Sequence, residues 1–176
     1  MATNLQNLEY NQTFPYRGGT AKFISKDDKS GKAWIEFNGQ CFRVDYKDIF
    51  GINYAEQMQE RNLAGIDDRI ATAQSNYDEY CAKIEAAKLT CKTEGKKQGF
   101  FAEAMSRILG GRKDKTELTG AKATEYAELE YQYNTSTKVG DRASSDILTY
   151  SIWAFDEALY KHDLYCQRSV AEHMLG

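Results

Sequence analysis

Histidine is one of the rarest residues in this sequence, and its scarcity excludes most catalytic and metal-binding chemistry. Two occur, His162 and His173. His162 and Cys166 stand four residues apart, on one face of a helix, and would supply half of a metal site or a Cys–His nucleophile pair. No second pair has this spacing. We therefore expect no enzyme, no catalytic or metal-ligating residue and no cofactor, and we keep a centre at His162 and Cys166 as the alternative.

Closely spaced cysteines and long apolar runs are also missing. The four cysteines are scattered along the chain without a C-x-x-C pair, which excludes a zinc ribbon or a disulfide framework. No apolar stretch reaches 18 residues, and the N-terminus shows no secretory signal. We expect a cytoplasmic protein, or one assembled in a particle within the cytoplasm, that has no transmembrane segment.

The sequence has little net charge and no phosphate-binding motif. A net charge of −3 gives no overall field that would attract DNA or a membrane. Neither of the glycine-rich spacings that cradle a phosphate occurs, and no nucleic-acid-binding motif is present. A nucleic acid stays open as a partner, without a motif that supports it.

Proline occurs once, at Pro15, so nothing after it breaks a helix. The first part of the chain nevertheless has the pattern of strands. Two β-rich runs flank Asn38-Gly39, and this dipeptide is the strongest short signal for a two-residue hairpin turn. Such a turn pairs Phe37 with Gln40, Ile35 with Phe42 and Trp34 with Arg43. We expect a small antiparallel sheet within residues 19–46, and helices that cover its apolar face.

The second part of the chain has helical periodicity. Between Leu63 and Cys91, residues at alternating steps of four and three form an apolar stripe of nearly four heptads. Its members are Ile66, Ile70, Ala73, Tyr77, Tyr80, Ile84, Ala87 and Cys91. Alanine and tyrosine favour antiparallel packing inside one chain over a parallel dimer. We expect a helix from about Tyr54 to Cys91.

The C-terminal segment has a second apolar stripe. Its members are Leu148, Ile152, Phe155, Leu159, His162, Cys166, Val170 and His173, and Ile147, Tyr150, Trp153 and Ala154 widen it. This breadth is typical of a helix that lies centrally in a bundle. Upstream, helical periodicity weakens around residues 134–141, which predicts either two helices or one kinked helix. The predicted fold is α+β, with a sheet segment at 1–50 and a long antiparallel helical hairpin or three-helix bundle at 51–176.

Residues 92–115 form the only basic segment, with seven Lys or Arg against three Asp or Glu. If the helices fold back on each other, this segment is the tip of the hairpin. Phe101, Ala104, Met105 and Ile108 share one helical face, and Gly110-Gly111 ends the element. The segment is a short third helix that packs on the bundle, an exposed docking surface for another subunit, or a surface for anionic lipid or nucleic acid. In the second case the partner-binding residues are Lys96, Lys97, Phe100, Phe101, Met105, Arg107, Ile108, Arg112 and Lys113.

These features favour a non-catalytic structural or assembly protein that acts through protein–protein contacts and associates with itself. A repeated subunit, such as a component of a virus or phage particle, would fit this description. The alternative is a small inhibitor or adaptor that binds one target, a protein or a nucleoprotein, through the basic tip and a tyrosine-rich face. The tyrosines at helical spacing are Tyr77, Tyr80, Tyr126, Tyr133, Tyr150, Tyr160 and Tyr165.

Overall fold

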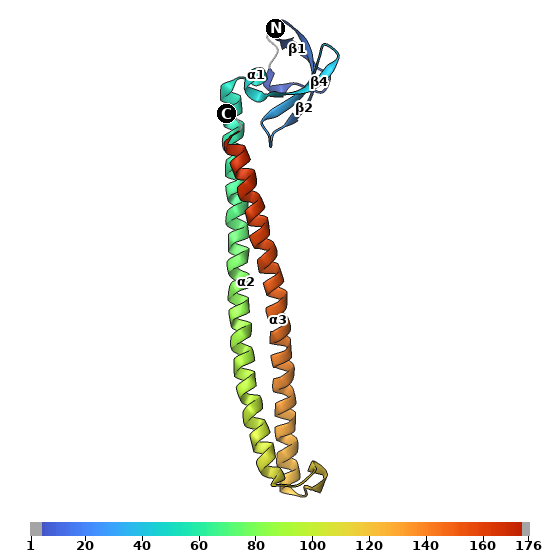
Figure 1. Cartoon of the computed structure of the whole chain (residues 1–176), viewed down its shortest axis with the longest axis vertical. Coiled ribbons are helices and arrows are strands. Elements are labelled where there is room, and N and C mark those ends of the chain that lie inside the picture. Colours follow the sequence, from blue (N-terminus) through green and yellow to red (C-terminus); the bar gives the residue numbers. More distant parts are fainter. Residues whose placement is uncertain (1–4, 174–176) are drawn as a thin grey trace. The chain divides into compact units, whose positions relative to one another are not determined.

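The computed structural model describes residues 5–173 of the chain and has the predicted α+β architecture (Figure 1). A four-stranded antiparallel sheet precedes two long helices. The elements are η1 (Leu5–Asn7), β1 (Thr13–Tyr16), β2 (Gly19–Asp27), β3 (Lys32–Phe37), β4 (Gln40–Asp45), α1 (Tyr46–Phe50), α2 (Ile52–Leu109), η2 (Lys115–Glu117) and α3 (Ala121–Glu172).

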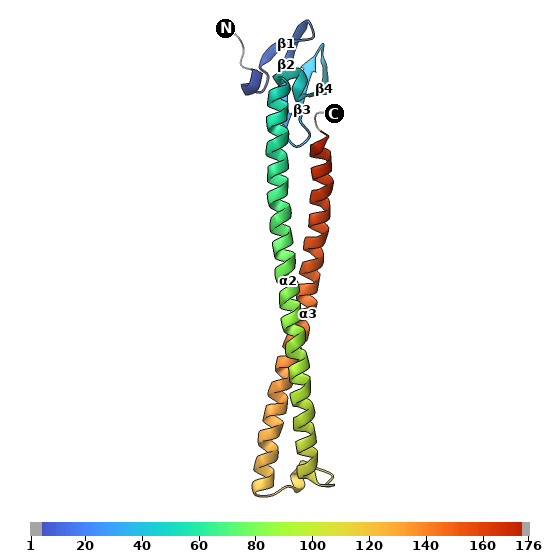
Figure 2. The same cartoon turned by 90° about the vertical axis from the view of Figure 1, so that its left-hand side faces the viewer.

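The described chain divides into two compact units. The sheet unit comprises residues 5–74 and 159–173, and the hairpin unit comprises residues 75–158. Both long helices contribute to both units. In each unit, α2 and α3 lie side by side and run in opposite directions (Figure 1 and Figure 2). The helical hairpin is therefore confirmed, whereas the domain boundary at residue 50 stays a prediction.

The hairpin between β3 and β4 has the predicted register. Phe37 pairs with Gln40, and Ile35 with Phe42. Asn38 and Gly39 both have positive φ, at 52° and 75°, as a two-residue turn of this hand requires. Ile35 is fully buried on the face that the pairing predicts, so the alternation of the sequence and the turn chemistry agree.

Strand β1 was not predicted, because it contains Pro15. Within the sheet β1 pairs with β2 alone, in the order β1-β2-β3-β4, so it is an edge strand. An edge strand tolerates a proline because one of its sides donates no ladder hydrogen bond. The sheet therefore has four strands and begins before residue 19, where the predicted sheet began.

The core of the sheet unit lies between one face of the sheet and the helices that follow it. Strand residues such as Phe14, Phe23 and Ile35 pack with Tyr46 of α1 and Ala55 of α2. The expectation that helices cover the apolar face is confirmed, and α1 supplies much of this cover. Gly51, at φ 87°, separates α1 from α2.

All eight residues of the predicted α2 stripe are buried or half-buried. The stripe continues beyond Cys91 at the same spacing, through Glu94, Gln98, Phe101, Met105 and Ile108. Helix α2 therefore ends at Leu109 and not near Cys91, and residues 92–109 are not a separate third helix. Gly110 and Gly111 have positive φ and end it as predicted.

Helix α3 is one continuous helix, so the predicted alternative of two helices is wrong. The polar residues near 134–141 are accommodated within it. The hydroxyls of Thr135 and Thr137 donate to carbonyls four residues earlier, at Tyr131 and Tyr133. Ser136 is buried instead, and its hydroxyl donates across to Glu94 of α2 at 2.7 Å. Polar side chains that find such partners need not interrupt a helix.

The face of α3 that packs on α2 is not the predicted one. The buried residues of α3 include Ser136, Ala143, Ala154, Leu164 and Ala171, all on the face that meets α2. The eight members of the predicted stripe, from Leu148 to His173, are all exposed. Residues that only widened the stripe in the sequence, such as Ile147, Tyr150 and Ala154, are among those that pack.

Candidate functional site

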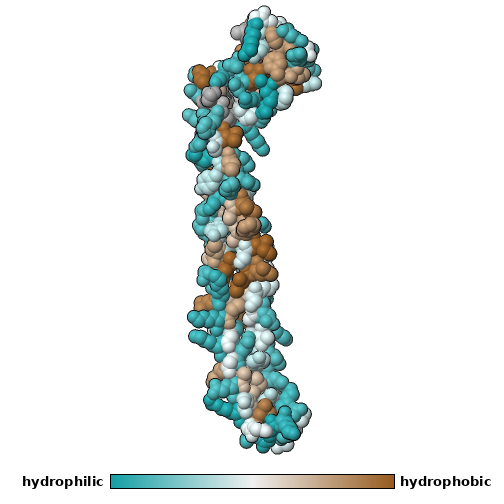
Figure 3. Space-filling view, in the orientation of Figure 1, coloured by the Kyte–Doolittle hydropathy of each residue, from teal (hydrophilic) through white to brown (hydrophobic). Residues whose placement is uncertain are grey.

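An exposed apolar stripe runs along α3 in the hairpin unit. It consists of Leu148, Ile152 and Phe155, which we call the outer stripe. Their exposed fractions are 65%, 51% and 64%. The spacing of four and three residues puts them on one face of the helix. Figure 3 shows apolar residues gathered on the side of the helical pair where Figure 1 shows α3.

The outer stripe is exposed because α2 covers a different stripe of the same helix. The covered residues, among them Ile147, Tyr150 and Ala154, also recur at steps of three and four. Each outer-stripe residue lies one or two positions away from them. A helix with two such stripes has two surfaces for packing, and in the hairpin unit α2 covers one of them.

An aromatic cluster fixes which face of α3 turns toward α2. The rings of Tyr80 and Tyr150 stack at 6.3 Å, and Trp153 contacts both, with ring centroids 5.6 Å from each. Lys83 lies over both tyrosine rings, at 5.7 and 5.4 Å from their centroids. Its hydrogen bond to Glu79 raises the pKa of the Lys83 ammonium, so the cation persists beside the rings.

The sequence around the outer stripe lacks charge. Between Asp146 and Asp156, nine consecutive residues carry none. Outward positions of a two-stranded coiled coil are ordinarily charged or polar. Here three of them are leucine, isoleucine and phenylalanine, which suits a surface that meets another apolar surface.

The predicted partner-binding residues of the tip divide into two groups. Phe101, Met105 and Ile108 are half-buried on the face of α2 that meets α3, whereas Phe100 is 65% exposed. The two phenylalanine rings meet edge-on, with centroids 5.8 Å apart. Three members of the predicted set therefore serve the hairpin's own packing.

The basic members of that set are exposed, and several are engaged locally. Lys97 pairs with Glu94 at 2.7 Å, and Arg107 pairs with Glu103. Arg112 donates to the carbonyl of Leu109 at 3.3 Å. Lys96 and Lys113 are exposed at the same end of the hairpin unit. Docking through these residues stays a prediction.

Glu94 is a buried carboxylate at this interface. The hydrogen bond from Lys97, followed by that from Ser136, holds the pKa of Glu94 below its ordinary value. The charge is thus paired where α2 and α3 meet. The ion pair with Lys97 lies within α2, whereas the hydrogen bond from Ser136 comes from α3 and ties the two helices together at this position.

His162 and Cys166 are both exposed on α3. Within residues 5–173, no three His, Cys, Asp or Glu side chains gather in a way that could hold a metal ion. The alternative centre at these two residues therefore has no further ligand near it in the described chain.

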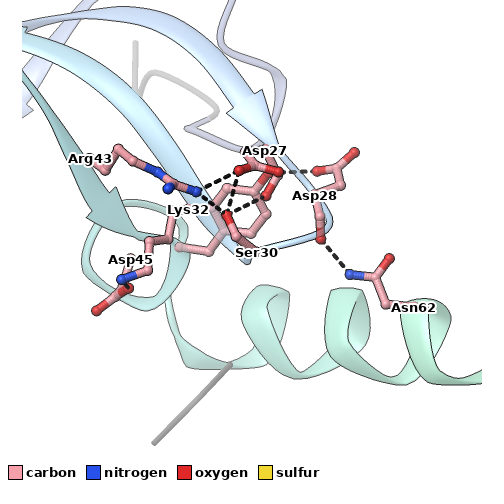
Figure 4. Close-up of polar contacts among 8 residues, drawn as sticks. Asp27, Asp28, Ser30, Lys32, Arg43, Asp45 and Asn62 are labelled. Atoms are coloured by element: carbon pink, nitrogen blue, oxygen red, sulfur yellow. Dashed lines mark hydrogen bonds and ion pairs between the residues drawn. The ribbon is translucent and has the colours of Figure 1, made fainter. Parts of the chain in front are cut away.

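A polar cluster that the sequence did not predict joins the β2–β3 turn to its surroundings (Figure 4). The carboxylate of Asp27 accepts hydrogen bonds from Ser30 at 2.7 Å and from Arg43 at 2.5 Å. These contacts, with the Ser30 hydroxyl foremost, lower the pKa of Asp27. Beside it, Lys32 pairs with Asp45 at 3.2 Å.

Asp28 ties the same turn to the helices. Its carboxylate accepts a hydrogen bond from the buried Tyr46 hydroxyl at 2.6 Å, and its carbonyl accepts one from Asn62 of α2. Burial, and then the hydrogen bond to Asp28, raises the pKa of Tyr46 far above its ordinary value. Residues 26–32 are polar in the sequence, but no sequence pattern predicts that Asn62 of α2 reaches this turn.

This turn is one wall of a cleft of about 970 Å³ in the sheet unit. The other walls are α2 between Met58 and Arg69 and the end of α3 between Cys166 and Val170. We call it the turn cleft. None of its residues belonged to the predicted partner-binding set, although Cys166 belonged to the alternative centre at His162 and Cys166.

Comparison with protein-family models, with curated proteins and with solved structures finds no match to this chain. None of the described helices has the length and apolarity that crossing a membrane requires. The function is therefore argued from the chain's own surfaces.

Proposed function

We propose that this chain is a non-catalytic assembly protein whose activity is contact with other protein chains. It associates with further copies of itself through the outer stripe of α3. The observation that carries this proposal is the exposure of Leu148, Ile152 and Phe155 at coiled-coil spacing on a helix whose other stripe is already paired.

The size of the exposed surface supports a repeated, reversible contact. Complete burial of a leucine, isoleucine or phenylalanine side chain contributes about 1.5–3 kcal/mol. More than half of each outer-stripe side chain is exposed, so burial of all three would contribute roughly 3–5 kcal/mol per copy. Association itself costs about 4–15 kcal/mol. Two such stripes roughly offset that cost, which suits a subunit that makes the contact many times in an assembly.

A second copy fits the stripe because the stripe is uncharged and self-complementary. Asp146 and Asp156 bound it, so two copies bring like charges near each other at its ends. Salt screens that repulsion. Self-association should therefore strengthen as ionic strength rises, whereas the binding of a basic partner should weaken.

The cytoplasm is the compartment that we propose, because the four cysteines are free thiols and Cys41 and Cys166 are exposed. Exposed thiols of this kind persist in a reducing compartment. A viral or phage particle assembled there is one setting in which a repeated subunit of this kind would act.

The inhibitor or adaptor remains the second candidate, and the exposed ring of Phe100 favours it. This ring lies among basic residues at the end of the hairpin unit, outside the α2–α3 contact. An aromatic side chain with neighbouring cations is a common centre of a protein interface. Such a protein would be monomeric or dimeric alone and would assemble only with its target.

Light scattering coupled to size-exclusion chromatography, over a range of concentrations, tests the proposed function. We expect concentration-dependent association of the wild-type chain. A chain that stays monomeric at every concentration and ionic strength would overturn self-association and favour the adaptor.

A further inference from the structure

The turn cleft contains a combination of side chains that the proposed assembly function does not use. Its apolar lining is Met58, Ile66 and Val170, together with the Cys166 side chain. Its cations are Lys29, Arg61 and Arg69. A cleft with an apolar lining and a few charged groups is the usual form of a small-molecule site.

The acidic residues of the cleft are already engaged. Asp27 accepts from Ser30 and Arg43, and Asp28 accepts from Tyr46. Arg61 has no hydrogen-bond or ion-pair partner within the described residues. The guanidinium of Arg69 donates one hydrogen bond within them, from Nε to the carbonyl of Gly65 at 3.2 Å. The positive charge on this wall is therefore available to an external anion.

Gly65 leaves the middle of the cleft open. It lies inside α2, where glycine costs about 1 kcal/mol relative to alanine. A Cβ added at this position would meet nothing within 4 Å. The glycine is thus not required by close packing, and its effect in this structure is to leave space between Arg61 and Arg69, one helical turn on either side.

We propose that the turn cleft binds a small amphiphilic anion, which has a carboxylate or phosphate head and an apolar body. The head would lie at Arg61 and Arg69, whose planar guanidinium groups suit two-oxygen anions. The body would cover Met58, Ile66 and Val170. The cleft volume of about 970 Å³ lies at the upper end of the usual range for such ligands, about 300–1,000 Å³. This site is separate from the outer stripe.

The test uses decanoate and decyl phosphate as probes, with 1-decanol and inorganic phosphate as half-probes, in calorimetry on the whole chain. Both anions should bind, and either half-probe should bind at least about tenfold more weakly. Equal binding of inorganic phosphate would overturn the apolar part of the proposal, and equal binding of 1-decanol would overturn the anionic part.

Two sets of variants locate the site. Gly65→Leu should fill the cleft and weaken the binding of both anions at least about tenfold, while the temperature of thermal unfolding stays the same as in the wild type or rises. Gly95→Leu is the matched control, because Gly95 is also an exposed helical glycine of α2 with nothing within 4 Å of an added Cβ. Arg61→Gln and Arg69→Gln should each weaken the anions and leave 1-decanol unaffected.

Alkylation of cysteines gives a readout that does not depend on substitution. Cys166 lines the cleft and is exposed, whereas Cys41 is exposed on β4 and does not line it. Decanoate should slow alkylation of Cys166 by iodoacetamide and leave Cys41 unchanged. The proposal is overturned if neither anion binds, if Gly95→Leu weakens binding as much as Gly65→Leu does, or if both thiols are protected alike.

Discussion

Replacement of Phe155 by serine should strongly weaken self-association and leave the fold intact. Phe155 is 64% exposed, so its ring contributes little to the folded monomer and much to any surface that covers it. Serine and phenylalanine have similar helix propensities, so α3 itself should be almost unaffected. The variant therefore separates the contact between copies from the stability of one copy.

The magnitude follows from the exposed fraction. Complete burial of a phenylalanine contributes about 1.5–3 kcal/mol, and about two thirds of that, roughly 1–2 kcal/mol, is still available in the monomer. A symmetric contact contains the residue twice, so the variant should lose about 2–4 kcal/mol. This corresponds to a dissociation constant about 30- to 700-fold higher. The cost to the folded monomer should stay below about 1 kcal/mol.

Sedimentation equilibrium at low and high salt measures the association, and urea unfolding monitored by circular dichroism measures the monomer. Leu89→Ser is the matched control, since Leu89 is 65% exposed on α2, within the hairpin unit but outside the outer stripe. It should associate as the wild type does. The reasoning is refuted if Phe155→Ser associates as strongly as the wild type, or if both serine variants lose association equally.

Four further outcomes follow from the packing and the polar contacts. Ile35→Ala, at a fully buried strand position, should lower the free energy of unfolding by about 2–5 kcal/mol in urea titrations, because it leaves a cavity in the sheet core. Phe101→Ser should destabilise the chain clearly more than Phe100→Ser, because Phe101 packs between the helices whereas Phe100 is exposed; equal effects in thermal unfolding would contradict this placement. Asp27 has a folded pKa below its ordinary value, so its contribution to the free energy of unfolding is present above about pH 4 and disappears as the pH falls through the folded pKa. Asp27→Asn should therefore make the free energy of unfolding fall less steeply toward acid pH in urea titrations, and only modestly so, since the carboxylate is partly exposed. Tyr46 has a folded pKa above the ordinary value of about 10, so the stability that it confers is present below that pH and decreases as the pH rises further. In an ultraviolet titration the folded wild type and folded Tyr46→Phe should therefore form the same number of tyrosinates near pH 10, and the variant should form one fewer only when both chains are unfolded. Ionisation of Tyr46 near pH 10 in the folded chain would contradict this placement.

The β3–β4 hairpin and the α2 stripe could be predicted because local chemistry determines both. Asn38-Gly39 admits few turns other than the one observed, and an exact alternation of strand residues fixes the register around it. Between Leu63 and Cys91, α2 has a single apolar stripe, and no second stripe competes with it for the contact with α3. In both cases the sequence pattern has a single structural solution.

Strand β1 and the turn cleft could not be predicted in the same way. Pro15 made its segment a poor strand by propensity, and the pairing with β2 at the sheet edge outweighed that preference. The turn cleft combines a turn, the first part of α2 and the end of α3, which come from three separate parts of the sequence. Both features depend on contacts between distant parts of the chain, and no local sequence pattern indicates them.

Helix α3 packs on α2 through a different face from the predicted one, and this difference leaves the outer stripe exposed. The helix presents two stripes at the same spacing. The predicted stripe, from Leu148 to His173, has the larger apolar residues and was expected to face α2. In the structure the stripe with smaller residues does so, including Gly140, Ala143 and Ala154. Small side chains let two helices approach closely, as the contact of the Cys91 thiol with the Gly140 carbonyl at 3.7 Å illustrates.

That choice of face leaves the larger residues of α3 without a partner in the described chain. If the outer stripe turned toward α2, Ser136 would lose its hydrogen bond to Glu94, and the aromatic cluster of Tyr80 and Tyr150 would separate. The polar and aromatic contacts thus keep the outer stripe on the solvent side of α3. Its apolar side chains stay exposed in the folded chain, and the free energy of burying them is not gained on folding. A second surface that covers Leu148, Ile152 and Phe155 would recover it, and for this reason assembly is the function that we infer from the structure.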